Sequence, residues 1–205
     1  MEKIVIFGAG GHAMSVVDIL LSSGDCKVLC MVTNEEPEGD IAGIPVVFEN
    51  HYLVQSCTSA VVAIGDNKIR KKLSVKLEQK GFRLVNAVSP HSYVSDLAVL
   101  GVGVVVMPFS VVGPGTTIGD GSIINTRAGV DHDCIIGSYT HIAPGSTICG
   151  FVVIGDCSFI CAGATVIDKI KIGSYCTVGA GAVVIRSLTD NKTVVGVPAK
   201  EIRRT

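Results

Sequence analysis

The second half of the sequence repeats an aliphatic residue at every sixth position without a single insertion. Its seventeen members are Val88, Val94, Leu100, Val106, Val112, Ile118, Ile124, Val130, Ile136, Ile142, Ile148, Ile154, Ile160, Val166, Ile172, Val178 and Val184. Val, Ile and Leu together make up 62 of the 205 residues, so chance does not produce an unbroken series of this length. A period of six excludes an α-helix, whose faces repeat every 3.6 residues, and a simple alternating strand.

The neighbours of each aliphatic residue indicate how such a chain folds. The next position is often Gly, as at Gly101 and Gly119, and the position two before is usually small. A three-sided prism accounts for this pattern: the aliphatic residue points to the axis, the small residue shares the interior and Gly lets the chain turn. Three hexads close one coil, so seventeen hexads predict a parallel β-helix of between five and six coils. A solenoid used only as a scaffold or an ice-binding surface would repeat identical outward residues, and here these are irregular.

Composition changes near residue 88 and narrows the possible classes of protein. Nine of the ten Leu lie at or before Leu100, whereas the 31 Val and 21 Ile are typical of a β-rich chain. The 17 Lys+Arg against 18 Asp+Glu give a formal charge of -1, which argues against nucleic-acid binding through a basic field. We find no signal peptide and no apolar run of the roughly 18 residues that a membrane span needs, so we expect a cytoplasmic globular protein.

The eight cysteines do not form a recognisable disulfide or metal pattern. None belongs to a Cys-x-x-Cys pair, and no His lies at zinc spacing from the nearest pairs, Cys26/Cys30 and Cys157/Cys161. We therefore expect reduced thiols that pack as small hydrophobic residues, and no metal.

Residues 1–87 open like a Rossmann nucleotide-binding fold. A predicted strand at 3–7 leads through a Gly-rich turn into an amphipathic helix, and a second strand follows at 27–32. Gly8, Gly10 and Ala13 satisfy the spacing G-x-G-x-x-G/A in this strand–turn–helix context. The glycines would let backbone N–H groups approach a phosphate at the helix N-terminus.

The identity of the ligand stays open at this point. Glu35 and Glu36 follow the second strand, where an acidic residue would meet a ribose hydroxyl. A third strand at 60–64 leads through Asp66 into a basic helix, where a solvated face is expected at Lys68, Arg70, Lys71 and Lys72. The motif taken literally indicates NAD, but only three or four strands fit before residue 88, which suits a mononucleotide or sugar nucleotide better. Alternatively, the glycines merely permit a tight turn.

His132 is the candidate for chemistry in the repeat region. It lies two positions after the core residue Val130, so it projects from the prism, and Asp131 and Asp133 flank it. A carboxylate beside an imidazole fixes its tautomer and raises its basicity, as a general base requires. Gly150 lies one coil further on and would leave room for a ligand against the backbone. The aspartates are alternatively plain turn residues.

Three motifs in this order resemble the NeuD/PglD family of bacterial sugar acetyltransferases over essentially the whole chain. They are Ile-Phe-Gly-Ala-Gly-Gly-His near the N-terminus, Asn125…Asp131-His132-Asp133…His141-Ile-Ala-Pro-Gly in the middle, and Val-Gly-Val-Pro-Ala-Lys at the end. The resemblance implies a nucleotide-sugar-binding domain at 1–87 and a left-handed β-helix acyltransferase domain at 88–205, with a C-terminal tail on the CoA side. It also implies a homotrimer with acetyl-CoA in the groove between adjacent β-helices.

The resemblance further implies a role for each matching residue. His132 corresponds to the general base, and Asp133 supplies the carboxylate after it, where some relatives carry Glu. Asn125 and His141 match positions near the acetyl group and the acceptor, and the backbone of Gly150 is a candidate oxyanion donor. The other expected acetyl-CoA contacts are Ala162, Ala180, Pro198 and Lys200. The expected nucleotide-sugar contacts are Gly8, Gly10, Gly11, His12, Glu35, Glu36 and Asp66.

The predicted function is acetyl-CoA-dependent N-acetylation of the amino group of a nucleotide-linked amino sugar in bacterial surface-glycan biosynthesis. Direct transfer in a ternary complex requires no Ser or Cys nucleophile, so Cys134 is assigned to the core. Two alternatives remain: O-acetylation of sialic acid or a related sugar, and a non-catalytic nucleotide sensor or scaffold. Neither a nucleic-acid partner nor a membrane span is expected, and the sequence does not specify the sugar or the nucleotide.

Overall fold

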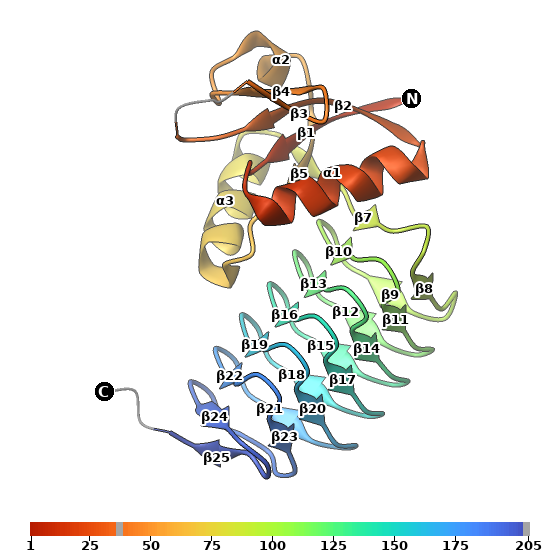
Figure 1. The fold of residues 1–205 in the computed structure, drawn as a ribbon, viewed down its shortest axis with the longest axis vertical. Helices are drawn as coiled ribbons and strands as arrows, with labels where there is room; N and C mark the ends of the chain where they lie inside the picture. Colours follow the sequence, from red (N-terminus) through yellow and green to blue (C-terminus); the bar gives the residue numbers. More distant parts are fainter. Residues whose placement is uncertain (36–38, 203–205) are drawn as a thin grey trace. The chain divides into compact units, whose positions relative to one another are not determined.

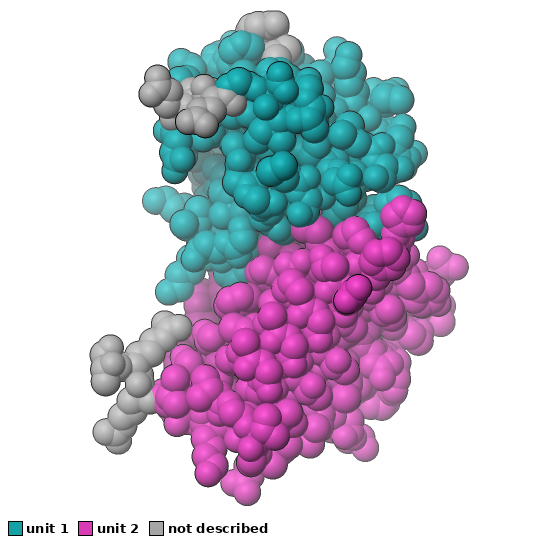
Figure 2. All heavy atoms as spheres, in the orientation of Figure 1, with its two compact units in different colours: residues 1–90 teal, residues 91–205 magenta. Residues whose placement is uncertain are grey.

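The structure is a computed structural model that describes residues 1–35 and 39–202. The chain divides into two compact units, Met1–Pro90 and His91–Thr205 (Figure 2). The first unit combines helices with a mostly parallel sheet, and the second forms a solenoid of short strands (Figure 1).

The first unit is an α/β sheet in the strand order β3-β4-β2-β1-β5-β6. All of its neighbours pair in parallel except β3 and β4, which are antiparallel. The elements of the first unit are β1 (Glu2–Phe7), α1 (Gly11–Ser23), β2 (Cys26–Val32), β3 (Asp40–Ile41), β4 (Ile44–Val47), α2 (Tyr52–Gln55), β5 (Ser59–Val62), α3 (Asn67–Gln79), β6 (Arg83–Leu84) and β7 (Ala87–Val88), of which β7 is not a strand of this sheet. The sequence predicted three or four strands; the sheet has six within the described residues because two-residue strands, too short to predict, extend both edges.

The turn between β1 and α1 requires glycine for a steric reason. Gly8 adopts φ +127°, and a Cβ there would lie 2.6 Å from the carbonyl oxygen of Ala63, which follows β5. Gly24 ends α1 in the left-handed conformation at φ 69°. The predicted strand–turn–helix context of the Gly-rich segment is therefore confirmed.

The basic helix α3 corrects one expectation about its charged face. Arg70 is fully buried, whereas a solvated position was predicted. Its Nη1 donates to the carbonyl oxygens of Ile64 and Gly65 at 3.0 Å each, and its Nη2 donates to Oδ1 of Asn67 at 2.7 Å. The guanidinium thus ties the first turn of α3 to the segment that follows β5, because buried carbonyl groups need donors.

The second unit is a three-sided parallel solenoid, as the period of six predicts. Face 1 contains β10 (Val105–Val106), β13 (Ile123–Ile124), β16 (His141–Ile142), β19 (Phe159–Ile160), β22 (Thr177–Val178), β24 (Thr193–Val195) and β25 (Lys200–Glu201). Face 2 contains β8 (Tyr93–Val94), β11 (Val111–Val112), β14 (Gly129–Val130), β17 (Thr147–Ile148), β20 (Thr165–Val166) and β23 (Val183–Val184). Face 3 contains β9 (Val99–Leu100), β12 (Thr117–Ile118), β15 (Ile135–Ile136), β18 (Val153–Ile154) and β21 (Lys171–Ile172). Strands from β8 to β23 each end on a predicted core residue and pair 18 positions apart, as Ile118 does with Ile136.

Buried hydroxyl groups link successive coils inside the solenoid. Ser122 and Thr140 are fully buried, and their hydroxyls donate to the carbonyl oxygens of Gly137 and Gly155 at 2.8 and 2.9 Å. The Ser122 hydroxyl also accepts from the backbone N–H of Thr140 at 3.1 Å. Because an unsatisfied buried hydroxyl is costly, these paired bonds explain why small polar residues share the interior with aliphatic ones.

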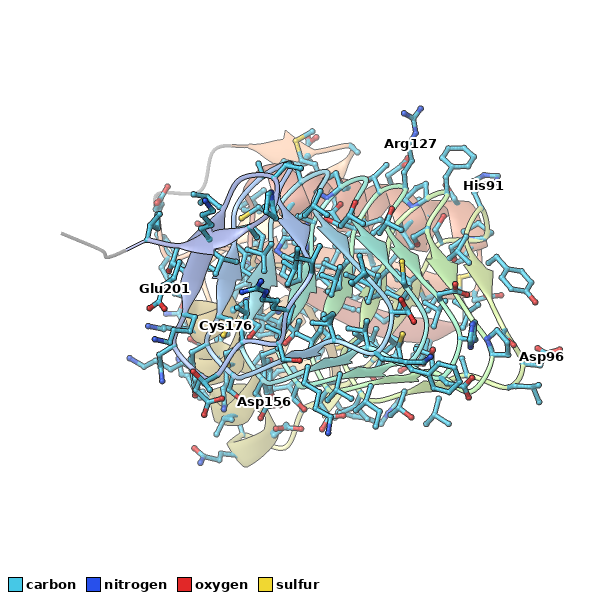
Figure 3. The ribbon with its side chains drawn as sticks, turned by 90° about the horizontal axis from the view of Figure 1, so that it is seen from below. His91, Asp96, Arg127, Asp156, Cys176 and Glu201 are labelled. Atoms are coloured by element: carbon cyan, nitrogen blue, oxygen red, sulfur yellow. The ribbon has the colours of Figure 1, made fainter. Side chains whose placement is uncertain are left out.

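Glycines that follow the core aliphatic residues serve close packing between coils. A Cβ on Gly119 would lie 2.6 Å from the backbone nitrogen of Ser138, although the φ of Gly119 is not left-handed. The predicted turning function belongs instead to residues later in each corner, such as Gly121 at φ 60° and Asp133 at φ 55°. At the corner between faces 3 and 1, the side chain of Asp156, labelled in Figure 3, also joins the coils: its Oδ1 accepts from the backbone N–H of Ser138 at 2.8 Å.

The solenoid continues beyond the last predicted hexad with a shortened coil. Thr177 pairs with Thr193, an offset of 16 residues instead of 18. Strand β25 then folds back antiparallel on β24. The missing two residues shift the hexad register, which is why the sequence pattern ends at Val184.

Candidate active site

His132 lies at the corner between faces 2 and 3, in the turn between β14 and β15. Its Nδ1 is 2.8 Å from Oδ2 of Asp133, and its backbone N–H donates to Oδ1 of Asp131 at 2.8 Å. The hydrogen bond to Asp133 is the main cause that raises the pKa of His132, and the charge of Asp131 adds to it. Because the carboxylate accepts the Nδ1 proton, Nε2 of the neutral ring carries the lone pair of a general base.

Gly150 lies one coil beyond His132 and makes space for its ring. A Cβ on Gly150 would stand 2.7 Å from both Nε2 and Cε1 of the imidazole. Phe151 packs edge-on against the same ring, with centroids 5.1 Å apart at 90°. The sequence predicted that this space was left for a ligand; in the structure the catalytic candidate itself occupies it, held by Phe151 and Asp133.

Cys134 follows this turn and points into the core. Its side chain is fully buried, and burial raises the pKa of its thiol. Its Sγ lies 3.2 Å from the carbonyl oxygen of Cys149. Since the thiolate is the nucleophilic form, this cysteine has neither the charge state nor the access for covalent catalysis.

Asn125 follows β13 at the corner between faces 1 and 2, and it forms a second pair with His141, the first residue of β16 on face 1. Asn125 Oδ1 accepts from the N–H of Thr126 at 2.7 Å, which leaves Nδ2 to face Nε2 of His141 at 3.0 Å. With the amide as donor, Nε2 of His141 accepts and the ring is the Nδ1–H tautomer. Phe159 tilts against the His141 ring at 5.0 Å, so this histidine is fixed and nearly buried.

Small residues continue along the same corner in the following coils. Ala162 and Ala180 are exposed there, each followed by a glycine with no atom within 4 Å of an added Cβ, Gly163 and Gly181. Arg127 extends away from the coil at the start of this strip (Figure 3). Pro198 and Lys200 lie at its far end, Lys200 on β25.

The two pairs lie at different corners of one chain. His132 and Gly150 mark the corner between faces 2 and 3, whereas Asn125 and the alanine strip lie at the corner between faces 1 and 2 and His141 lies on face 1. The face that carries β14 separates them. The structure therefore brings His132 beside Gly150 and Asn125 beside His141, but it does not bring the two pairs together in a single chain.

A cavity of about 330 Å³ opens in the first unit beside the Gly-rich turn. Gly8 and Gly10 line it, and Glu35 lies on its rim. Gly10 caps α1 without a side-chain hydrogen bond, and an added Cβ on Gly10 or Gly11 would touch nothing. The start of α1 is thus uncrowded beside the cavity, as an anion site at a helix N-terminus requires.

Three other residues were predicted to contact the nucleotide sugar, and the structure describes two of them. His12 is largely buried, and burial, with the charge of Arg70, lowers its pKa to about 4, so the ring is neutral at physiological pH. Asp66 caps α3 by accepting the N–H groups of Lys68 and Ile69 at 2.9 and 2.8 Å. Glu36 lies outside the described residues.

Sequence reasoning missed several residues that the structure places beside these sites. Phe151 packs against the ring of His132. Its position in the sequence, one coil beyond the turn that carries His132, could have indicated this contact. Glu49 and Lys76 line the cavity of the first unit together with Leu73. Nothing in the sequence pairs residues 49 and 76, because the fold alone joins the end of β4 to α3.

Within residues 1–35 and 39–202, we find no cluster of three or more His, Cys, Asp or Glu side chains that could hold a metal ion. No helix among the described residues is long and apolar enough to span a membrane.

Two family models match the two units. The model described as PglD N-terminal domain matches residues 3–77, and the model described as bacterial transferase hexapeptide (six repeats) matches residues 115–150 and 151–186. GDP-perosamine N-acetyltransferase from Escherichia coli O157:H7 is 32% identical over 159 residues, which cover 74% of this chain and 72% of that protein.

Solved structures agree over nearly the whole chain. PerB from Caulobacter crescentus, in complex with CoA and GDP-perosamine, has a TM-score of 0.93 at 40% identity and covers 99% of this chain and 98% of its own. The acetyltransferase domain of PglB from Neisseria gonorrhoeae FA1090, in complex with acetyl coenzyme A, has a TM-score of 0.92 at 35% identity and covers 98% of this chain and 99% of its own.

Proposed function

This chain belongs to the acetyl-CoA-dependent N-acetyltransferases of nucleotide amino sugars that join a PglD N-terminal domain to hexapeptide repeats, and we propose that its acceptor is a GDP-linked amino sugar such as GDP-perosamine. The observation that carries the proposed acetyl-transfer chemistry is the hydrogen-bonded pair of His132 and Asp133, in which Nε2 of His132 lies over Gly150. The relatives named above support the acceptor class.

His132 acts as the general base in the proposed mechanism. Its Nε2 takes a proton from the sugar amine while the amine nitrogen bonds to the thioester carbonyl carbon. The carbon–sulfur bond then breaks, and the proton passes from the imidazolium to the departing thiolate of CoA. Asp133 holds the Nδ1 proton throughout and stabilises the charged ring.

The strip formed by Ala162, Gly163, Ala180 and Gly181 fits an extended CoA chain. Short side chains with open space above them admit an extended ligand against the backbone. Asn125 and His141 lie at the start of this strip, where the acetyl group would lie. Pro198 and Lys200 lie at the other end, where an ammonium group suits a phosphate.

We infer a homotrimer from the separation of the two pairs. A neighbouring copy that brings its alanine strip beside His132 completes a site that one chain leaves divided. Exposed aliphatic residues on the solenoid, such as Val111 and Ile135, suit burial between copies.

The test is thiol release from acetyl-CoA with GDP- and UDP-linked amino sugars and with free sialic acid, followed by mass spectrometry of the products. We expect a single acetyl amide on the GDP-linked amino sugar. His132→Ala should lower kcat/KM by about 10²–10⁴-fold, whereas His91→Ala, at a histidine that stacks on Phe109 and is not among the predicted site residues, should leave it unchanged. Turnover on sialic acid alone would replace the proposal with O-acetylation, and full activity of His132→Ala would refute the assignment of the base.

A further inference from the structure

We propose that Glu49 and Lys76 read the nucleobase of the acceptor and select guanine over uracil, an inference that rests on the proposed nucleotide-sugar function. Both residues line the cavity that begins at the Gly-rich turn. Their ion pair, Lys76 Nζ to Glu49 Oε2 at 2.8 Å, lies on the cavity wall.

The cavity has the place and the size for a nucleoside. Phe7, Val32 and Ile64 line it at or just beyond the carboxyl ends of the parallel strands β1, β2 and β5, where open α/β sheets bind ligands. Its volume of about 330 Å³ lies at the low end of small-molecule sites, which run from roughly 300 to 1,000 Å³.

The chemistry of the lining changes across the cavity. The Gly-rich turn and the open N-terminus of α1 suit a phosphate, and Glu35 suits a ribose hydroxyl. Ile64 and Leu73 supply apolar surface for a flat ring. Once these parts of a nucleotide are assigned, Glu49 and Lys76 are the charged lining residues left to face the base.

The pair matches the hydrogen-bonding edge of guanine. Guanine presents an acceptor, O6, beside two adjacent donors, N1–H and the N2 amino group. The ammonium of Lys76 can donate to O6, and the carboxylate of Glu49 can accept from both donors. Uracil presents a carbonyl oxygen in place of the amino group, which would face the carboxylate and repel it.

The carboxylate of Glu49 is already ionised and accessible before a nucleobase binds. Lys76 and Lys80 both bond to its carboxylate, and these bonds lower its pKa, so the group is ionised at neutral pH. Its side chain is 28% exposed, which leaves it accessible to a ligand. A carboxylate has lone pairs for about four hydrogen bonds, so two bonds to lysines leave capacity for the base.

The experiment is calorimetric titration of the full-length protein with GDP, UDP, ADP and inosine diphosphate, which lacks the N2 amino group. The unchanged protein should bind GDP about tenfold more tightly than inosine diphosphate or UDP. Glu49→Gln should weaken GDP about tenfold and leave UDP within twofold. Lys76→Met should weaken GDP and inosine diphosphate alike, because both carry O6.

A matched control separates recognition from structure. Lys72→Met removes an exposed ammonium elsewhere on α3, and this lysine does not line the cavity. It should keep the GDP preference. Equal weakening of GDP and UDP by Glu49→Gln, a preference of the unchanged protein for ADP or UDP, or equal binding of GDP and inosine diphosphate would each overturn the inference.

The acetyl-transfer assay distinguishes this failure from failure of the proposed function. Transfer to amino sugars with no nucleobase preference would support the proposed acetyl transfer and refute nucleobase recognition by Glu49 and Lys76. The opposite result is a protein that acetylates no acceptor but has a GDP preference that Glu49→Gln abolishes. It would support nucleobase recognition by Glu49 and Lys76 and refute the proposed reaction.

Discussion

Replacing Gly150 with alanine should lower kcat/KM about a hundredfold without unfolding the protein. The new Cβ would lie 2.7 Å from both Nε2 and Cε1 of His132 and 3.3 Å from Cδ2. Non-bonded carbon atoms settle at about 3.5–4.0 Å, so the imidazole must retreat by about 1 Å. A misplacement of about 1 Å in a catalytic group costs on the order of 10²-fold in rate.

The fold should tolerate this alanine because the atoms that it meets belong to the exposed end of a side chain. Gly150 does not have a left-handed φ, so alanine causes no backbone strain. We expect the free energy of unfolding to change by less than about 1 kcal/mol. The assay is thiol release from acetyl-CoA, with urea unfolding as the control for stability.

A double-mutant cycle tests whether Gly150→Ala acts by displacing the imidazole of His132. In a His132→Ala background no imidazole remains to be displaced, so Gly150→Ala should cause almost no further loss. A further hundredfold loss in that background would refute the steric argument. It would show that Gly150 acts through another contact, such as a backbone donor to the acyl oxygen.

Three further predictions concern pH and stability. Asp133→Asn removes the main cause that raises the pKa of His132, so the acidic limb of the pH profile of kcat/KM should move to lower pH; an unmoved limb would refute the pairing. Burial lowers the pKa of His12 from 6.5 to about 4, so between these pH values the unfolded chain binds a proton that the folded chain does not. This difference lowers the free energy of unfolding by about 3 kcal/mol at pH 4. In urea titrations, the free energy of unfolding should fall less over that pH range for His12→Gln than for the unchanged protein. Ile118→Ala should lower the free energy of unfolding by about 2–5 kcal/mol, because its side chain is fully buried in the solenoid core.

The solenoid was predictable from the sequence because its interior leaves each hexad one main aliphatic position. A single residue such as Ile118 or Ile136 fills the axis on each face, so any insertion would move a polar residue inside. The pattern failed only where the coil shortened, between Thr177 and Thr193, because the offset of 16 residues breaks the period that carries the signal.

The first unit was predictable in its local turns but not in its long-range contacts. The Gly8 turn follows from strand–turn–helix chemistry within a few residues. In the sequence, Arg70 looks like part of a solvated basic run. Only the fold shows that its guanidinium donates to the carbonyl oxygens of Ile64 and Gly65, which follow β5. Glu49 and Lys76 are 27 residues apart in sequence and meet because α3 packs near the end of β4.

The solenoid also explains why the candidate base His132 lies at a corner. Along each face, the aliphatic side chain points inward and the backbone pairs with the coils on either side, so neither is free for a substrate. At a corner the chain adopts left-handed φ, as at Asp133, and side chains leave the prism in directions that neighbouring coils do not cover. A base such as His132 therefore gains access at one corner but cannot reach a partner at the next, because a whole face intervenes. The prism geometry therefore supports our proposal that a second copy completes the site.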